Sequence, residues 1–195
     1  MPPKPRITRQ MILDAAYAIA REQGAEMINA RIIAQRLGCS TQPVLYYFAR
    51  MEDIRREVYR MADMYQTEYL MQLPEHLNPM IAIGLNYVRF SVSEKHLFRL
   101  LFQSDSFNGQ NIADLVDTPE LTPVLEIFQQ EAGLNREQTK FLFKTLTMLI
   151  HGCASLLANN TMEYDEAEII PMLETAFNGI MAALKMEGTP NEKTL

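Results

Sequence analysis

The sequence has no tryptophan and only two cysteines among its 195 residues. Cys39 and Cys153 lie far apart in the chain, which argues against a disulfide framework and against a zinc site built on cysteine pairs. Both cysteines are expected to be free, buried thiols. Neither His96 nor His151 has a partner at metal-ligand spacing, so both are expected to be structural. The sequence therefore predicts no metal and no other cofactor.

Long uninterrupted apolar runs are missing as well. The longest apolar stretch, residues 141–157, is broken by a lysine, two threonines and a histidine. No segment has the length and composition of a signal peptide or a transmembrane helix. The sequence predicts a cytoplasmic protein that does not contact the membrane.

Catalytic signatures are also absent. The chain contains no glycine-rich phosphate loop, no serine or cysteine nucleophile motif and no paired histidines at helical spacing. We therefore expect no catalytic residues, and the sequence argues against an enzyme.

Charge is distributed unevenly along the chain, whose net charge is −6. Residues 1–60 hold ten Lys and Arg against six Asp and Glu, a balance of +4, and the remainder has a balance of −10. A basic segment on an acidic protein is typical of a chain in which only one end meets phosphate groups.

Apolar residues recur at intervals of three and four, without the alternation of strands, so the sequence predicts an all-α protein of about nine helices. Gly24, Gly38 and Gly133 are expected to end helices, whereas Asn29, Ser40 or Thr41, and Asn135 are expected to begin them. Residues 1–6 and 188–195 read as loose termini, and residues 104–118 as a polar loop. The predicted helices cover about 8–23, 29–37, 40–47, 51–73, 79–93, 94–103, 119–132, 135–158 and 165–186.

Residues 29–54 carry the most informative pattern. Two short predicted helices flank a turn at Gly38, which is the arrangement of a helix-turn-helix. Their apolar residues can pack on the first helix and complete a three-helix head: Ile32, Ile33, Leu37, Val44 and Phe48. The outward residues and two flanking arginines are candidates for DNA contact: Arg31, Ser40, Thr41, Gln42, Pro43, Leu45, Tyr46, Tyr47 and Arg50.

The outward side chains suit different parts of DNA. Thr41 and Gln42 can hydrogen-bond base edges, whereas Pro43 and Leu45 can touch thymine methyl groups. The two tyrosines and the two arginines are long enough to reach phosphates. A plain three-helix bundle with half-buried tyrosines fits the same periodicity and is the alternative.

In this block the chain resembles the TetR family of transcriptional regulators. The motifs that carry the resemblance are Ile12-Leu13-Asp14-Ala15-Ala16, Ile33-Ala34, Leu37-Gly38-Cys39-Ser40, Tyr46-Tyr47-Phe48 and Glu52-Asp53-Ile54. The resemblance implies a helix-turn-helix DNA-binding domain at residues 1–52, a ligand-binding and dimerisation domain at 53–188, and a tail at 189–195.

Three positions depart from the family pattern. Leu45 replaces a usual tyrosine, Tyr47 a usual histidine, and Met51 the lysine that usually binds phosphate. We expect Arg50 to supply that phosphate contact. Glu52 and Asp53 are expected to complement the dipole of the next helix and to have no catalytic role.

The C-terminal half resembles the family more weakly, through a His-Gly segment at Ile150–Leu157 without the tryptophan that often precedes it. The resemblance implies a homodimer in which the two last helices pair with their copies. Packing of these helices within one subunit is the alternative. Small residues would allow the close approach at the dimer interface: Gly152, Ser155, Ala176, Gly179 and Ala183.

A small apolar or amphipathic effector is expected to bind among residues of the regulatory helices, and thirteen methionines would make such a pocket adaptable. The tentative ligand residues are Tyr87, Phe90, His96, Phe98, Phe102, Met148 and His151. The sequence thus predicts a ligand-responsive regulator that binds a palindromic operator, with repression as the expected mode and activation as an alternative. A helical module that binds protein instead of DNA is the other alternative.

Overall fold

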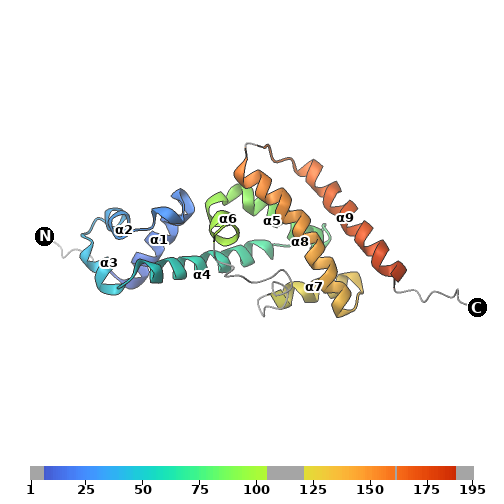
Figure 1. The fold of residues 1–195 in the computed structure, drawn as a ribbon, viewed down its shortest axis with the longest axis horizontal. Helices are drawn as coiled ribbons and strands as arrows, with labels where there is room; N and C mark the ends of the chain where they lie inside the picture. The colour runs from blue at the N-terminus through green and yellow to red at the C-terminus, as the bar shows by residue number, and fades with distance from the viewer. Residues whose placement is uncertain (1–6, 105–120, 161, 188–195) are drawn as a thin grey trace, which may run out of the picture. The chain divides into compact units, whose positions relative to one another are not determined.

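The computed structural model describes residues 7–104, 121–160 and 162–187. These residues form nine α-helices, one short 3-10 helix and no strand, which confirms the predicted all-α class (Figure 1). The predicted termini and the predicted loop beyond residue 104 lie outside the described residues. The elements are α1 (Arg9–Gln23), η1 (Ala25–Met27), α2 (Ala30–Arg36), α3 (Gln42–Tyr47), α4 (Met51–Leu70), α5 (Pro79–Ser93), α6 (Lys95–Phe102), α7 (Thr122–Ala132), α8 (Arg136–Asn159) and α9 (Glu166–Glu187).

The helix ends follow the capping residues that the sequence contains. Asn29 Oδ1 accepts a hydrogen bond from the Ile32 N–H at 3.0 Å and so begins α2. Asn135 begins α8 in a capping box, because its side chain accepts from the Gln138 N–H and the Gln138 side chain accepts from the Asn135 N–H. Thr41 precedes α3 as predicted, but its side chain makes no capping hydrogen bond.

Helix α4 ends at Leu70, three residues before the predicted end. Asn86, which is buried, donates from Nδ2 to the carbonyl oxygens of Leu70 at 3.2 Å and Gln72 at 2.9 Å. These carbonyl oxygens lie beyond the last helical hydrogen bonds of α4 and need partners. A side chain from α5 therefore sets the end of α4, and Pro74 only prevents the helix from continuing.

The chain divides into two compact units. The described part of the first unit is residues 7–68 and 93–104, and that of the second is 69–92, 121–160 and 162–187. The first unit therefore contains α6 and most of α4 in addition to the three helices of the predicted head. The functional boundary predicted between Glu52 and Asp53 stays a prediction.

The first unit is built around α1, whose inward side is apolar. Helices α2, α3 and α6 all contact α1. The fully buried side chains Ile12 and Ile19 of α1 share this interior with Ile33 of α2 and Val44 of α3, as the apolar pattern predicts. Leu37 and Ile32 are only partly buried.

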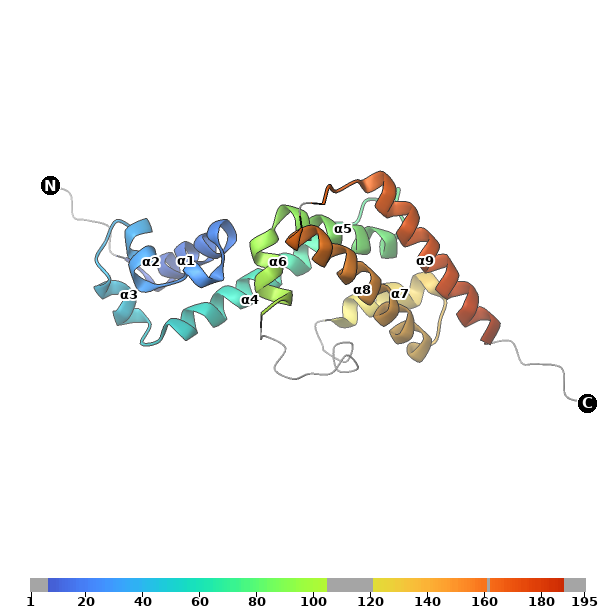
Figure 2. The same ribbon diagram turned by 45° about the horizontal axis from the view of Figure 1, so that its top comes forward.

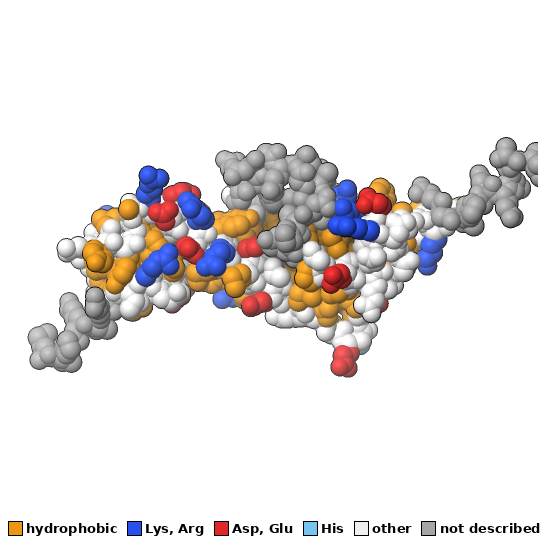
Figure 3. Space-filling model, turned by 90° about the horizontal axis from the view of Figure 1, so that it is seen from below, with side chains coloured by type: hydrophobic (Ala, Val, Ile, Leu, Met, Phe, Trp, Pro, Cys, Tyr) orange, Lys and Arg blue, Asp and Glu red, His pale blue; other side chains and the backbone are white. Residues whose placement is uncertain are grey.

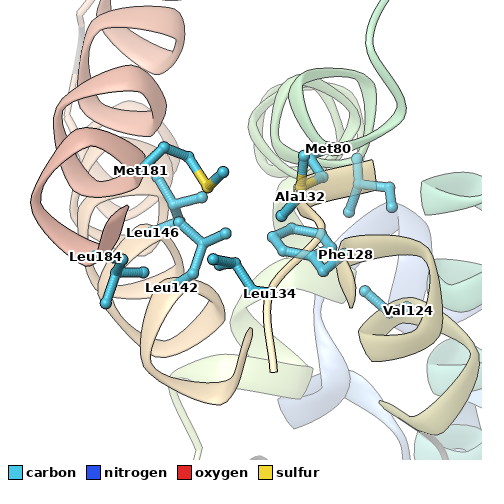
Figure 4. Close-up of a cluster of buried hydrophobic side chains, with 10 residues drawn as sticks. Met80, Val124, Phe128, Ala132, Leu134, Leu142, Leu146, Met181 and Leu184 are labelled. Atoms are coloured by element: carbon cyan, nitrogen blue, oxygen red, sulfur yellow. The ribbon is translucent and has the colours of Figure 1, made fainter. Parts of the chain in front are cut away.

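The second unit is an α-helical layer around α5, which is buried on most sides. Figure 4 shows a cluster of its core, in which side chains from α7, α8 and α9 gather with Met80 of α5. Helices α8 and α9 are neighbours in Figures 1 and 2 and contact each other. Gly84 of α5 leaves room for the Ile150 side chain of α8, because a Cβ atom at this position would lie 2.9 Å from Ile150 Cδ1.

Candidate nucleic-acid interface

The turn between α2 and α3 has the backbone conformation of a helix-turn-helix connection. Gly38 adopts a left-handed conformation with φ of 62°, which favours glycine. The Gly38 N–H donates to the Gln35 carbonyl, and the Cys39 N–H donates to the Ala34 carbonyl at 3.0 Å. These bonds end α2 and direct the chain into α3.

Helix α3 presents one side to the core and one to solvent. Val44 is fully buried, and Phe48 directly after the helix is nearly so. On the other side, Leu45 is 55% exposed and Tyr46 is 81% exposed. The remaining predicted DNA-contact residues are exposed or, for Pro43 and Tyr47, partly buried. All nine candidates therefore have accessible surface, and their contact with DNA stays a prediction.

The arginines of residues 7–60 differ in their partners. Six of the eight form ion pairs with carboxylates: Arg9, Arg21, Arg36, Arg55, Arg56 and Arg60. Figure 3 shows this mixture of basic and acidic side chains on the surface near the N-terminus. Within the described residues, Arg31 and Arg50 have no ion-pair partner, and both are exposed. The two unpaired guanidinium groups are the two that flank the helix-turn-helix.

Residues after α3 are held within α4. Glu52 and Asp53 lie in its first turn and pair with Arg55 at 3.5 Å and Arg56 at 3.6 Å. This geometry fits the structural role predicted for both carboxylates. Met51, which stands where the family pattern has lysine, is partly buried.

A buried carboxylate fixes α6 to the first unit. Arg21 of α1 donates from both Nε, at 2.8 Å, and Nη2 to the carboxylate of Glu94, whose side chain is 8% exposed. Tyr65 of α4 donates to the same carboxylate at 3.1 Å, and the Arg21 guanidinium lies over the Tyr65 ring. The hydrogen bond with Glu94 raises the pKa of Arg21, which therefore stays charged. Sequence patterns did not reveal this cluster, because its partners are up to 73 residues apart.

The tentative effector residues are divided between the two units. His96, Phe98 and Phe102 belong to α6 in the first unit, whereas Tyr87, Phe90, Met148 and His151 belong to the second. Phe90 and Phe98 are fully buried in the cores of their units. An open hollow of about 420 Å³ in the second unit is lined by other residues: Tyr69, Gln72, Leu73, Pro74, Asn86 and Arg89. Effector binding by the predicted residues stays a prediction.

Tyr87, His151 and Ser155 form a polar contact between α5 and α8. The Tyr87 hydroxyl lies 3.0 Å from His151 Nδ1, and the Ser155 hydroxyl lies 3.4 Å from Nε2 of the same ring. Burial lowers the pKa of His151 and raises the pKa of Tyr87. The structure therefore brings together two of the predicted ligand residues, and His151 is hydrogen-bonded as expected.

We expect the free energy of unfolding to fall as pH is lowered from 7 to 5.5, in a way that depends on His151. Unfolding restores an ordinary histidine pKa of about 6.5, so below that pH the unfolded chain binds a proton that the folded chain does not. Urea denaturation across this range should show the effect for the native chain and a weaker pH dependence for His151→Gln. His76→Gln, at an exposed position, is the control and should behave like the native chain. Equal pH dependence in all three proteins would contradict this account.

Helices α8 and α9 both leave large apolar side chains exposed. On α8, the residues at helical spacing Phe141, Met148 and Leu156 are 45–55% exposed, and on α9 Met172 and Met186 are exposed. Gly152 and Gly179 lie on these exposed sides, and a Cβ atom on either would meet no neighbour within 4 Å. Nothing described in the single chain requires glycine at either position. Among the other predicted interface residues, Ala183 is exposed, and Ser155 and Ala176 are partly buried.

Length and composition alone would allow α8 and α9 to cross a membrane, which corrects the expectation that no segment has a transmembrane composition: the interrupting polar residues do not lower the mean hydropathy enough. Their most apolar windows are only 28% and 22% buried, so the single chain does not cover them. The expectation of no membrane contact stays a prediction.

The two cysteines are free but half-buried, which corrects the expectation that both are buried, because Cys39 lies in the exposed turn and Cys153 is not enclosed by the core.

No group of three or more His, Cys, Asp or Glu side chains in the described ranges could hold a metal ion.

No protein-family model matches the chain, and no curated protein matches its sequence. Among solved structures, the chain is similar to a TetR transcriptional regulator from Rhodococcus sp. RHA1. The similarity covers 90% of this chain and 97% of that one, with 17% sequence identity and a TM-score of 0.47. Function is therefore inferred from the side chains of this chain.

Proposed function

We propose that the chain is a ligand-responsive transcriptional regulator that binds a palindromic operator as a homodimer. The observation that carries the proposal is the position of the unpaired arginines. Arg31 lies before the turn of the helix-turn-helix and Arg50 lies after α3, so the two cations are on either side of an exposed, neutral helix. The two cations can bind DNA phosphates, and the helix between them in the chain can enter the major groove.

The homodimer is supported by the apolar surface of α8 and α9. Exposed apolar surface of this extent marks an interaction site in a soluble protein. A twofold interface brings the same two helices of each subunit together, and exposed glycines permit close approach of the backbones. Two copies of α3 would then read two half-sites about one DNA turn, ~34 Å, apart.

The response to an effector is proposed to act through α4. Three residues separate this helix from α3, and its last two residues, Tyr69 and Leu70, belong to the second unit. An effector bound in the second unit would shift α4, and the two recognition helices would lose their spacing. Loss of DNA on effector binding would make the chain a repressor.

A mobility-shift assay with the DNA upstream of the chain's own gene tests the proposal. We expect a complex that unlabelled upstream DNA displaces and unrelated DNA does not. Each neutralised phosphate contributes about −0.9 to the slope of log Kobs against log salt, so four unpaired arginines in a dimer predict a slope of about −4 or steeper. Absence of any specific complex would contradict the proposal.

A second candidate function is binding of a protein partner by the head, favoured by the neutral surface of α3 with exposed Leu45 and Tyr46. An apolar protein interface would depend little on salt, whereas DNA binding weakens steeply as salt rises. A shallow salt dependence of whatever the head binds would favour this alternative.

Gly179→Arg is expected to convert the dimer into a monomer. The substitution has room in the single chain and replaces a poor helix former, so the subunit should remain folded. In the dimer, however, it would bury a charge without a partner. Sedimentation velocity should show the native mass halved, while the control Gln130→Arg, at an exposed position on α7, should stay dimeric. A dimeric Gly179→Arg protein would exclude this part of α9 from the interface.

A further inference from the structure

Helix α3 carries no charged side chain on its exposed surface. The helix consists of Gln42, Pro43, Val44, Leu45, Tyr46 and Tyr47. Gln42, Leu45 and Tyr46 stand at positions i, i+3 and i+4 and share the solvent-facing side, while Val44 faces the core. The surface that could contact base edges therefore consists of the amide of Gln42, the apolar side chain of Leu45 and the aromatic ring of Tyr46.

These side chains discriminate among base pairs. Guanine presents two acceptors in the major groove, which arginine or lysine reads, and the amino group of cytosine is read by aspartate or glutamate. Helix α3 has none of these residues. An amide such as Gln42 matches the acceptor and donor of adenine, and an apolar side chain such as Leu45 contacts the methyl group of thymine.

We propose that α3 recognises A·T base pairs, with Gln42 on adenine and Leu45 against a thymine methyl group. This inference rests on the proposed function, because it specifies what the same surface reads in DNA. Arg31 and Arg50 lie outside α3, and the proposal assigns both cations to the DNA backbone. Leu45 is then a specificity-determining residue whose exposure in the free protein ends on binding.

The test begins with selection of bound sequences from a pool of randomised duplex DNA by the full-length chain. Each thymine of the selected duplex is then replaced by deoxyuridine, which lacks only the methyl group. We expect one or two thymines in each half-site to be sensitive. Loss of one methyl contact should weaken binding about fourfold, and loss in both half-sites about fifteenfold.

The same series in Leu45→Ala should show no further loss at those thymines, because the contact is already gone. Met64→Ala is the matched control, since Met64 on α4 is 56% exposed and Leu45 is 55% exposed. It should retain full sensitivity to deoxyuridine. The series with the native chain needs no variant, so it remains a test even if Leu45→Ala does not fold.

The outcomes separate this inference from the proposed function. Failure to enrich any sequence would overturn the proposed function, and this inference with it. Enriched sites that tolerate deoxyuridine at every thymine, or that have only G·C pairs where the protein protects the major groove, would overturn the inference and leave the function standing. Equal sensitivity of the native chain and Leu45→Ala at every thymine would overturn the role of Leu45.

Discussion

Replacing Arg31 or Arg50 with alanine is expected to weaken DNA binding about 100-fold at 0.1 M salt, whatever the DNA sequence. One phosphate contact contributes about tenfold to affinity at this salt concentration through counterion release, and a dimer loses two contacts. The slope of log affinity against log salt should become shallower by about 2 in each variant. Fluorescence anisotropy with one specific and one unrelated duplex measures both effects.

Arg60→Ala is the matched control for this experiment. It removes one arginine from the same unit, but Arg60 is already paired with Glu57 at 2.9 Å on α4. Its removal should change affinity and salt slope much less than removal of an unpaired cation. If the three variants weakened binding equally, the change in net charge would explain the effect, and specific phosphate contacts by Arg31 and Arg50 would be excluded.

Replacing Arg21 with alanine is expected to lower the free energy of unfolding by about 2 kcal/mol. The substitution leaves the buried Glu94 carboxylate with Tyr65 as its remaining described partner and without a cation. Breaking a buried ion pair costs about 3–5 kcal/mol, and the half-exposed guanidinium of Arg21 reduces that figure. Because Glu94 stands between α5 and α6, loss of the pair should loosen α6 from α1. Urea denaturation measures the free energy, and hydrogen exchange on α6 measures the loosening.

A second two-bonded ion pair, between Glu22 of α1 and Arg36 of α2, supplies a close control. Arg36 binds Glu22 through two hydrogen bonds of 2.7 Å, from Nη1 and Nη2, whereas Arg21 binds Glu94 through Nε and Nη2. The Glu22 side chain, however, is 52% exposed, so water replaces the cation when it is removed. Arg36→Ala should therefore change stability far less than Arg21→Ala. Equal effects would show that burial of Glu94 contributes nothing to the pair.

The helical content and the helix-turn-helix were predictable because their determinants are local. Asn29 and Asn135 begin helices through hydrogen bonds that span three residues, and Gly38 turns the chain where a left-handed backbone is needed. The side of α3 that faces solvent likewise follows from a period of three to four residues.

Features that depend on distant contacts were not predictable. The end of α4 is set by Asn86, sixteen residues from Leu70, and the place of α6 by Arg21 and Glu94. The predicted effector residues follow from residue type alone, which does not distinguish Phe90 and Phe98 in the core from side chains that line a cavity. Ion pairing also needed the structure, because sequence alone does not show that Arg31 and Arg50 lack carboxylate partners among the described residues.

A hydroxyl-radical footprint of the full-length chain on its upstream DNA tests the central claim most directly. Two copies of one helix-turn-helix predict two protected patches on the same face of the duplex, with centres about 10 base pairs or a multiple of that number apart. Arg31→Ala should weaken both patches together. Continuous protection along the DNA without a boundary, or no protection at concentrations where the chain is dimeric, would contradict the account.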